Sequence, residues 1–169
     1  MKILTLLRHA KSDWDDPSQR DFDRPLNARG RAAAAGMGAE LRRLGLGFDR
    51  IVASPSRRTT ETMERLAAAY GPLPLVYDER VYLASVPTLL HIVQAADDAD
   101  DRLMIVGHNP GMERLALALA REDDLRDQVA AKFPTAALAE VRFDVARWGE
   151  VDEGTGTLAR FILPRDLAA

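Results

Sequence analysis

Short apolar runs alternate along this chain with longer segments in which apolar residues recur every three or four positions. The runs have Leu, Ile or Val at their centres and the length of strands buried on both faces of a sheet. They lie at residues 3–7, 48–53, 75–77 and 102–106. Each run precedes a segment with helical spacing, and these segments lie at residues 28–44, 55–70, 85–96 and 111–120. After a short charged helix within 121–134, two further strands are predicted at residues 137–143 and 158–163.

The order of these elements predicts the fold class. Parallel strands need a crossover connection, and a helix usually provides it. Four strand–helix pairs followed by two strands therefore predict an α/β protein, a three-layer α/β/α sandwich with a mainly parallel sheet and helices on both faces. The 169 residues suit one domain with its own core, and the chain shows neither an internal repeat nor a linker composition. We therefore expect a single domain over residues 1–169.

The second predicted helix begins with an unusual charge pattern. Ser54 is a suitable N-cap and Pro55 a suitable first helical residue. Arg57 and Arg58 then lie in the first turn, where a cation opposes the helix dipole. An anion in front of the helix would explain one of these arginines. The other is expected to pair with a carboxylate on the surface.

Polar residues end two of the predicted strands. Arg8 and His9 follow the first strand directly, and His108 follows the 102–106 strand, just before a helix that Asn109 and Pro110 would begin. The carboxyl ends of parallel strands meet at one edge of a sheet, where open α/β sheets bind their ligands. Two histidines and two arginines at this edge form a cationic pocket without a metal-ligand set. Such a pocket favours a small polyanion, and a phosphoryl group fits it best.

The composition of the chain excludes several classes of function. The chain has 23 basic and 26 acidic residues, a net charge of -3, so it has no broad basic surface for nucleic acid or an anionic membrane. It has no cysteine, which excludes disulfides and thiol chemistry. No apolar run is long enough to cross a bilayer, and the first run stops at Arg8, too soon for a signal peptide. We therefore expect a cytoplasmic protein.

A long polar loop at residues 10–26 follows the first strand. Its acidic residues show no spacing typical of an ion-binding loop, and we interpret them as solvated charge. Trp14 would cover a site or hold the loop down. Lys11 and Arg24 would extend the cationic edge toward a substrate.

Several segments, in order along the chain, resemble motifs of the histidine phosphatase superfamily, the phosphoglycerate mutase-like proteins. They are Leu7-Arg8-His9-Ala10, Arg24-Pro25-Leu26-Asn27-x-x-Gly30, Ser54-Pro55-x-x-Arg58-x-x-x-Thr62 and Gly107-His108-Asn109-Pro110-Gly111. In the first motif the family usually has Gly where this chain has Ala10, a variant typical of the SixA-like phosphohistidine phosphatase branch. The resemblance implies a phosphoglycerate mutase-like fold over the chain.

The resemblance also implies roles for individual residues. His9 would be the nucleophile, and Arg8, Arg58 and His108 would bind the phosphoryl group and stabilise the transition state. The segment from Asp78 to Tyr82 resembles the mutase segment that carries a proton donor, which nominates Glu79 as the acid. Alternatively, Glu79 pairs with its neighbour Arg80 or faces solvent. SixA-like proteins are described as lacking a dedicated acid, because the P–N bond of phosphohistidine is labile.

These implications predict a metal-independent phosphatase that needs no cofactor and works through a covalent phosphohistidine. Its substrate would be a protein that carries phosphohistidine, or a small phosphorylated metabolite. Two alternatives remain open at this point: a general small-molecule phosphomonoesterase, and a catalytically weak module that binds phosphoprotein. A phosphomutase is a further relative, but it needs to exclude water, and this short chain has little inserted sequence for a lid.

Overall fold

Six strands form one mixed sheet in the computed structural model, which describes residues 1–167. In chain order the strands are β1 (Lys2–Arg8), β2 (Arg50–Ala53), β3 (Leu75–Tyr77), β4 (Arg102–Gly107), β5 (Leu138–Phe143) and β6 (Thr157–Ile162). Across the sheet their order is β3-β2-β4-β1-β5-β6. The first four in this order are parallel, whereas β5 and β6 are antiparallel to their neighbours. The predicted mainly parallel sheet is confirmed, with β1 in its interior.

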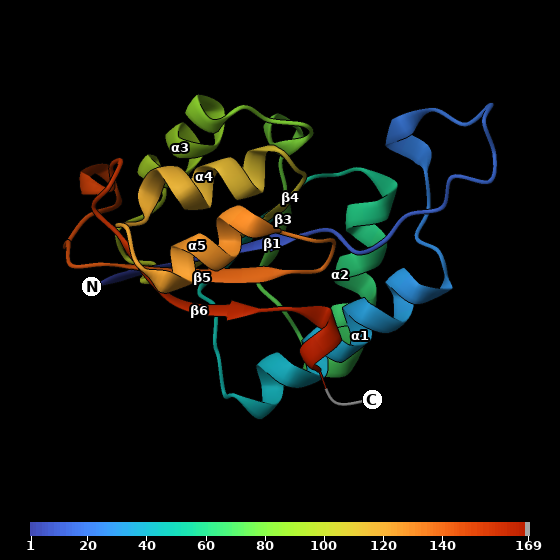
Figure 1. Cartoon of the computed structure of the whole chain (residues 1–169), viewed down its shortest axis with the longest axis horizontal. Coiled ribbons are helices and arrows are strands. Elements are labelled where there is room, and N and C mark those ends of the chain that lie inside the picture. The colour runs from blue at the N-terminus through green and yellow to red at the C-terminus, as the bar shows by residue number, and fades with distance from the viewer. Residues whose placement is uncertain (168–169) are drawn as a thin grey trace.

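Helices cover both faces of this sheet, as predicted. They are α1 (Ala28–Arg43), α2 (Arg57–Tyr70), α3 (Val86–Gln94), α4 (Gly111–Leu119) and α5 (Asp124–Ala131). In Figure 1, α1 and α2 lie on one side of the strands and α3, α4 and α5 on the other. The three-layer α/β/α arrangement therefore follows from strands that must bury apolar side chains on both faces. None of the helices described is long and apolar enough to cross a membrane.

The two faces of β1 contribute to separate hydrophobic cores. Leu4 and Leu6 pack in the cluster that contains Met112 of α4, whereas Leu7 packs in the cluster that contains Met37 of α1. Alternate side chains of a strand point to opposite faces, so a run of consecutive buried residues is needed to fill both cores. The end of β1 is consequently held on both sides, and the residues that follow it start from a rigid position.

One helix begins later than the sequence predicts. The predicted N-cap Ser54 does not cap α2, which begins at Arg57 after Ser56. The Ser54 hydroxyl instead contacts His108 and accepts a hydrogen bond from the backbone of Ser56. The contact with His108, which is distant in sequence, is not visible in the local sequence. By contrast, α4 begins at Gly111, where the sequence predicts it.

The long loop after β1 extends from the body of the molecule beside the carboxyl ends of the strands (Figure 1). Its base is fixed against α1, where Asn27 caps the helix by accepting a hydrogen bond from Gly30 N at 2.8 Å. A Cβ atom on Gly30 would lie 2.1 Å from the carbonyl oxygen of Lys11. Only glycine fits this approach, which explains the spacing of the motif at residues 24–30.

Candidate active site

The carboxyl ends of β1 and β4 place two histidines side by side. Arg8 pairs with Gly107 in the parallel register, and His9 N donates to Gly107 O at 3.0 Å. The rings of His9 and His108 follow directly, with centroids 5.1 Å apart. Both residues are buried, with 6% and 3% of their surface exposed. The predicted meeting of the two strand ends is thus observed.

Hydrogen bonds define the protonation of His9. Its Nδ1 lies 2.7 Å from the carbonyl oxygen of Ala10, which can only accept, so Nδ1 carries the proton. Its Nε2 accepts from Arg58 Nε at 3.3 Å. Burial, and then the neighbouring His108, Arg58 and Arg8, together lower the pKa of His9 to about 3, against the opposing effect of the Ala10 bond. At neutral pH His9 is therefore an uncharged imidazole with its lone pair on Nε2.

Arg58 connects the two histidines. Its Nη2 donates to His108 Nδ1 at 3.2 Å, so the neutral His108 ring carries its proton on Nε2. That Nε2 donates to the hydroxyl of Ser54 at 2.8 Å. Burial, and then the charge of Arg58, lower the pKa of His108 to about 3. Ser54 therefore orients the second histidine, a role that the sequence did not indicate.

The position of Arg58 depends on Thr62, one turn later on α2. The Thr62 hydroxyl donates to Arg58 O at 2.6 Å and accepts from Ala10 N at 3.0 Å. This pair of bonds ties the loop after β1 to the helix that carries the arginine. Arg57 instead forms an ion pair with Glu61 at 3.0 Å. The expected division between one inward and one surface arginine is therefore observed.

Arg8 brings a second guanidinium to the same place. Its Nη1 donates to Phe133 O at 3.1 Å, but its buried Nε has no hydrogen-bond partner among the residues described. A buried donor without a partner is costly, and an anion in the adjacent cavity would satisfy it. The donor set at this edge therefore fits an oxyanion.

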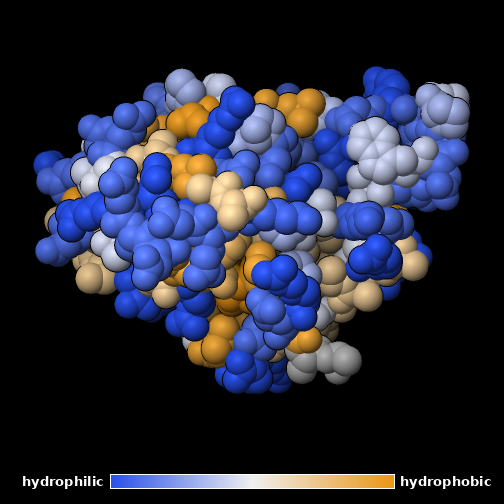
Figure 2. Space-filling view, viewed as in Figure 1, coloured by the Kyte–Doolittle hydropathy of each residue, from blue (hydrophilic) through white to orange (hydrophobic). Residues whose placement is uncertain are grey.

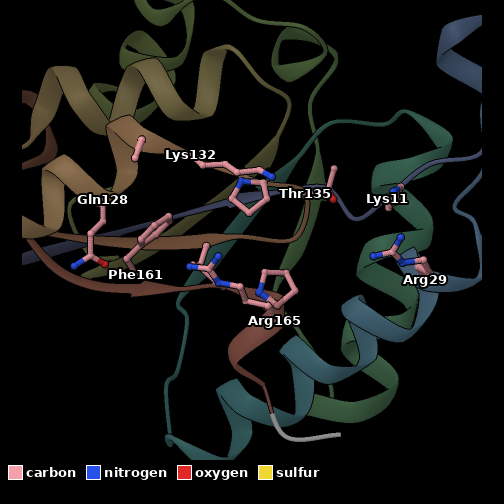
Figure 3. Close-up of a pocket in the computed structure, with 11 residues that line it drawn as sticks. Lys11, Arg29, Gln128, Lys132, Thr135, Phe161 and Arg165 are labelled. Atoms are coloured by element: carbon pink, nitrogen blue, oxygen red, sulfur yellow. The ribbon is translucent and has the colours of Figure 1, made fainter.

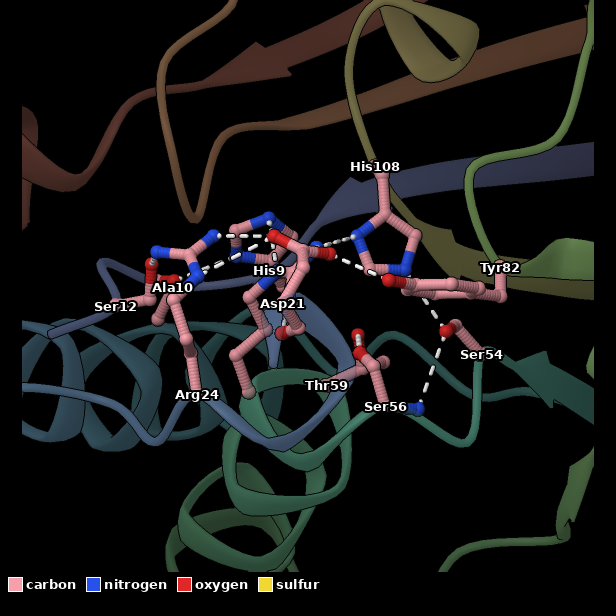
Figure 4. A network of polar contacts seen from close by, with 11 residues as sticks. His9, Ala10, Ser12, Asp21, Arg24, Ser54, Ser56, Thr59, Tyr82 and His108 are labelled. Atoms are coloured by element: carbon pink, nitrogen blue, oxygen red, sulfur yellow. Dashed lines mark hydrogen bonds and ion pairs between the residues drawn. The ribbon is translucent and has the colours of Figure 1, made fainter. Parts of the chain in front are cut away.

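Asp21 corrects our interpretation of the long loop. Its carboxylate accepts from Arg58 Nη2 at 3.0 Å, from Arg24 Nη2 at 3.0 Å and from the hydroxyl of Tyr82 at 2.5 Å. Burial alone would raise its pKa, but the hydrogen bonds from Tyr82, Arg58 and Arg24 outweigh this effect and lower the pKa to about 2. Asp21 is thus a paired charge, although its side chain is 43% exposed. It is a carboxylate held over the histidines (Figure 4).

These groups surround a cavity of about 490 Å³. Its lining includes Arg8, His9, Arg58, His108, Asn109, Lys11, Arg24, Asp21 and Trp14. The Trp14 ring is largely exposed and stacks on Arg24, with the guanidinium carbon 3.4 Å from the ring centroid. Trp14 therefore forms part of the rim and is not buried in the loop.

Glu79, the nominated acid, lies elsewhere. It is exposed on a short 3-10 helix at Glu79–Val81 and is not among the residues that line the cavity. Its neighbour Arg80 pairs with Asp78 at 2.7 Å, not with Glu79. The structure thus places the predicted nucleophile and the predicted phosphate-binding residues together and leaves Glu79 outside the group. Its role stays a prediction.

Comparison with known proteins shows the family to which the chain belongs. The family model described as the histidine phosphatase superfamily, branch 1, matches residues 4–82. An uncharacterized protein of Mycobacterium tuberculosis is 32% identical over 163 residues, which cover 94% of this chain and 100% of that protein. The chain belongs to the histidine phosphatase superfamily, branch 1.

Solved structures show which members of that superfamily the chain resembles in fold. A candidate phosphohistidine phosphatase, SixA from Agrobacterium tumefaciens, is 32% identical with a TM-score of 0.83, over 96% of this chain and 98% of that one. A protein histidine phosphatase SixA in complex with tungstate has a TM-score of 0.80 at 20% identity, over 97% and 98% of the two chains. At that identity the second match shows the fold alone. The fold is SixA-like over nearly the whole length.

Proposed function

We propose that this protein is a phosphatase that forms a covalent phosphohistidine on His9 and acts on phosphohistidine-bearing protein. One observation carries the proposal. His9 is buried and neutral, its Nδ1 proton is fixed on the Ala10 carbonyl, and its Nε2 lone pair lies beside Arg58 in the cavity. A fixed tautomer with one unprotonated nitrogen is what a histidine nucleophile requires.

In the first step, the Nε2 lone pair of His9 attacks phosphorus. The Nε2–P bond forms as the bond from phosphorus to the leaving imidazole nitrogen or ester oxygen breaks, and the leaving atom keeps that electron pair and gains a proton. In the second step, water attacks phosphorus, the Nε2–P bond breaks, and the released proton leaves with phosphate or solvent. His9 regains its lone pair, and the Nδ1–H bond to Ala10 holds the ring in place throughout.

The arginines stabilise charge on the transferring group. Guanidinium groups bind phosphoryl oxygens in a bidentate manner, and Arg8 and Arg58 are both fixed by protein contacts before substrate arrives. Preorganised cations of this kind provide the charge neutralisation that other phosphoryl-transfer enzymes obtain from Mg²⁺. We therefore propose that turnover needs no metal ion. His108 completes the set, because a bound phosphate favours its protonated, donating form.

The source of the leaving-group proton favours phosphohistidine over phosphate esters. Asp21 is the one carboxylate among the described residues that line the cavity, but its pKa of about 2 keeps it ionised at neutral pH, and an ionised group cannot donate a proton. Glu79 is exposed and outside the cavity lining. An imidazole leaving group takes a proton readily, whereas an alkoxide needs an acid. A phosphoramidate is thus the better substrate for this site.

The test is turnover by the purified protein on two substrates in the presence of EDTA. Rapid release of phosphate from a phosphohistidine-bearing protein, with little from an alkyl phosphate ester such as glycerol 2-phosphate, is expected. Fast hydrolysis of the ester would instead indicate a general phosphomonoesterase with a working acid. No release from either substrate by the folded protein would contradict the proposal and favour a module that binds phosphoprotein.

A further inference from the structure

A second hollow, of about 790 Å³, continues from the catalytic cavity toward the edge of the sheet. The two share Lys11, Lys132, Pro134 and Thr135 as lining residues. The hollow then runs between α5 and the end of β6 to Arg165, with Arg29 of α1 on its other side. We call this hollow the edge groove. Figure 3 shows Gln128 at one end of it and Lys11 at the other.

The edge groove is strongly basic in a chain of net charge -3. Four cationic side chains line it, and no acidic residue does; the cations are Lys11, Arg29, Lys132 and Arg165. Within residues 1–167 the first three form no ion pair, and Arg165 has only a 3.9 Å contact with its exposed neighbour Asp166. Many other arginines of the protein pair with a carboxylate at about 3 Å. The charge of this groove is therefore uncompensated.

The floor of the groove is apolar. Phe161, Leu163, Pro134 and Pro164 line it, and all four are partly exposed. Figure 2 shows hydrophobic residues recessed between hydrophilic ones on this face, where α5 and β6 lie in Figure 1. Among residues 1–167 the adjoining strand β6 pairs only with β5, so it is an edge strand whose outer side presents backbone donors and acceptors outside the sheet ladder. An apolar floor, a cationic rim and a free strand edge suit an extended polypeptide.

We propose that the edge groove binds an acidic polypeptide segment that flanks the phosphorylated residue of a protein substrate. The proposal rests on the proposed function, because it concerns the substrate of the same site. A small metabolite held by its phosphate in the catalytic cavity could reach Lys11 and Lys132, which line both cavities, but would leave Arg29 and Arg165 without partners. Acidic side chains next to the phosphohistidine would reach them while the intervening residues cover the apolar floor.

The experiment compares two phosphohistidine peptides of equal length, one with Asp and Glu around the phosphohistidine and one with Asn and Gln. The measured quantity is the ratio of their kcat/KM values at low salt. We expect the wild-type protein to favour the acidic peptide about tenfold, as two or more exposed ion pairs provide. The Arg29→Glu/Arg165→Glu variant should bring the ratio near one, and so should high salt. The matched control is Arg42→Glu/Arg121→Glu, the same charge change at exposed arginines outside both cavities, which should keep the ratio.

Two further measurements separate failure of this proposal from failure of the proposed function. Hydrolysis of free phosphohistidine tests the catalytic site alone. Hydrolysis of this compound, with no preference between the two peptides, would overturn only the proposal that the edge groove binds an acidic segment. Fluorescence anisotropy with the unphosphorylated acidic peptide tests the groove without turnover. Equal binding by the wild-type protein and the Arg29→Glu/Arg165→Glu variant would overturn the proposal whether or not catalysis occurs. Binding of inorganic tripolyphosphate in preference to the peptide would overturn it in favour of a small polyanion.

Discussion

At the scale of single residues, the chemistry depends on the uncharged state of His9. Replacing it with alanine removes the only lone pair that the Ala10 and Arg58 contacts hold in place. We expect His9→Ala to lower kcat on phosphohistidine at least about 1,000-fold, since loss of a nucleophile has effects of this size or larger. The measurement is phosphate release, together with a search for acid-labile phosphoenzyme.

His91→Ala is the matched control, because His91 is exposed on α3. It should keep wild-type turnover. His9→Ala should keep a cooperative thermal transition, because the side chain belongs to no hydrophobic cluster. A folded His9→Ala variant with wild-type turnover would refute the mechanism.

Asp21 gives a second prediction at this scale. Its carboxylate occupies donors of Arg58 and Arg24 that a phosphate oxygen would use. We expect Asp21→Asn to tighten competitive inhibition by inorganic phosphate about three- to tenfold, since this half-exposed ion pair is worth on the order of 1 kcal/mol. The loop variant Asp16→Asn, with an exposed side chain whose bonds are local, should leave inhibition unchanged. Unaltered phosphate inhibition with lost ester hydrolysis would instead assign Asp21 a catalytic role.

The predicted role of Glu79 as the proton donor can be tested directly. As the proton donor, it would be needed more by an ester than by a phosphoramidate, because an alkoxide is the poorer leaving group. Glu79→Gln should then slow ester hydrolysis more than phosphohistidine hydrolysis. Equal rates relative to wild type on both substrates, measured with an alkyl phosphate ester such as glycerol 2-phosphate and with phosphohistidine, would remove Glu79 as the acid.

The sequence predicted the groups at strand ends better than those in the loop. Arg8, His9 and His108 follow apolar runs, so the position of each was fixed by a strand whose place in the sheet could be predicted. Asp21 follows no run and lies in a segment without periodicity, and its partners Arg58 and Tyr82 are distant in sequence. Ser54 resembled an ordinary helix cap. Only the packed structure shows that its hydroxyl faces His108.

At the scale of elements, Thr62 connects the loop after β1 to α2. Thr62→Val keeps the volume but removes the acceptor of Ala10 N and the donor to Arg58 O. A buried amide without a partner costs about 1–3 kcal/mol, so we expect the free energy of unfolding in urea to fall by that amount. Thr60→Val on the same helix should have a smaller effect, because the Thr60 hydroxyl bonds only to Arg57 O, at the exposed surface. Equal losses from both variants would show that Thr62 does not connect the elements.

The elements themselves were largely predictable, whereas their partners were not. Each buried run and each amphipathic segment has a local signal, so the strand–helix order could be read along the chain. The place of β5 next to β1, antiparallel to it, depends on which face and edge remained open after the parallel strands had paired. The edge groove likewise depends on how elements that are distant in sequence lie together. Its cations come from the loop after β1, from α1, from the residue after α5 and from the segment after β6.

At the scale of the whole molecule, two buried neutral histidines link stability to pH. The pKa values of His9 and His108 are lowered to about 3 by burial in the folded state, whereas an unfolded histidine has a pKa of about 6.5. Between these values the unfolded chain binds more protons than the folded one, so the free energy of unfolding falls as pH decreases. The contribution is fully present above about pH 6.5 and is lost progressively toward pH 3.

The expected slope is up to about 1.4 kcal/mol per pH unit for each histidine, so stability should fall by about 1–3 kcal/mol between pH 7.5 and pH 5.5. Asp21, with its pKa lowered to about 2, contributes stability that is constant above about pH 4 and is lost only below that pH, so it does not affect this window. Urea unfolding at the two pH values measures the difference, and His108→Asn should roughly halve it. Identical stability of the wild-type protein at both pH values would mean that the histidines keep a pKa near 6.5 in the folded state, and a proton would then occupy the attacking nitrogen of His9 below that pH.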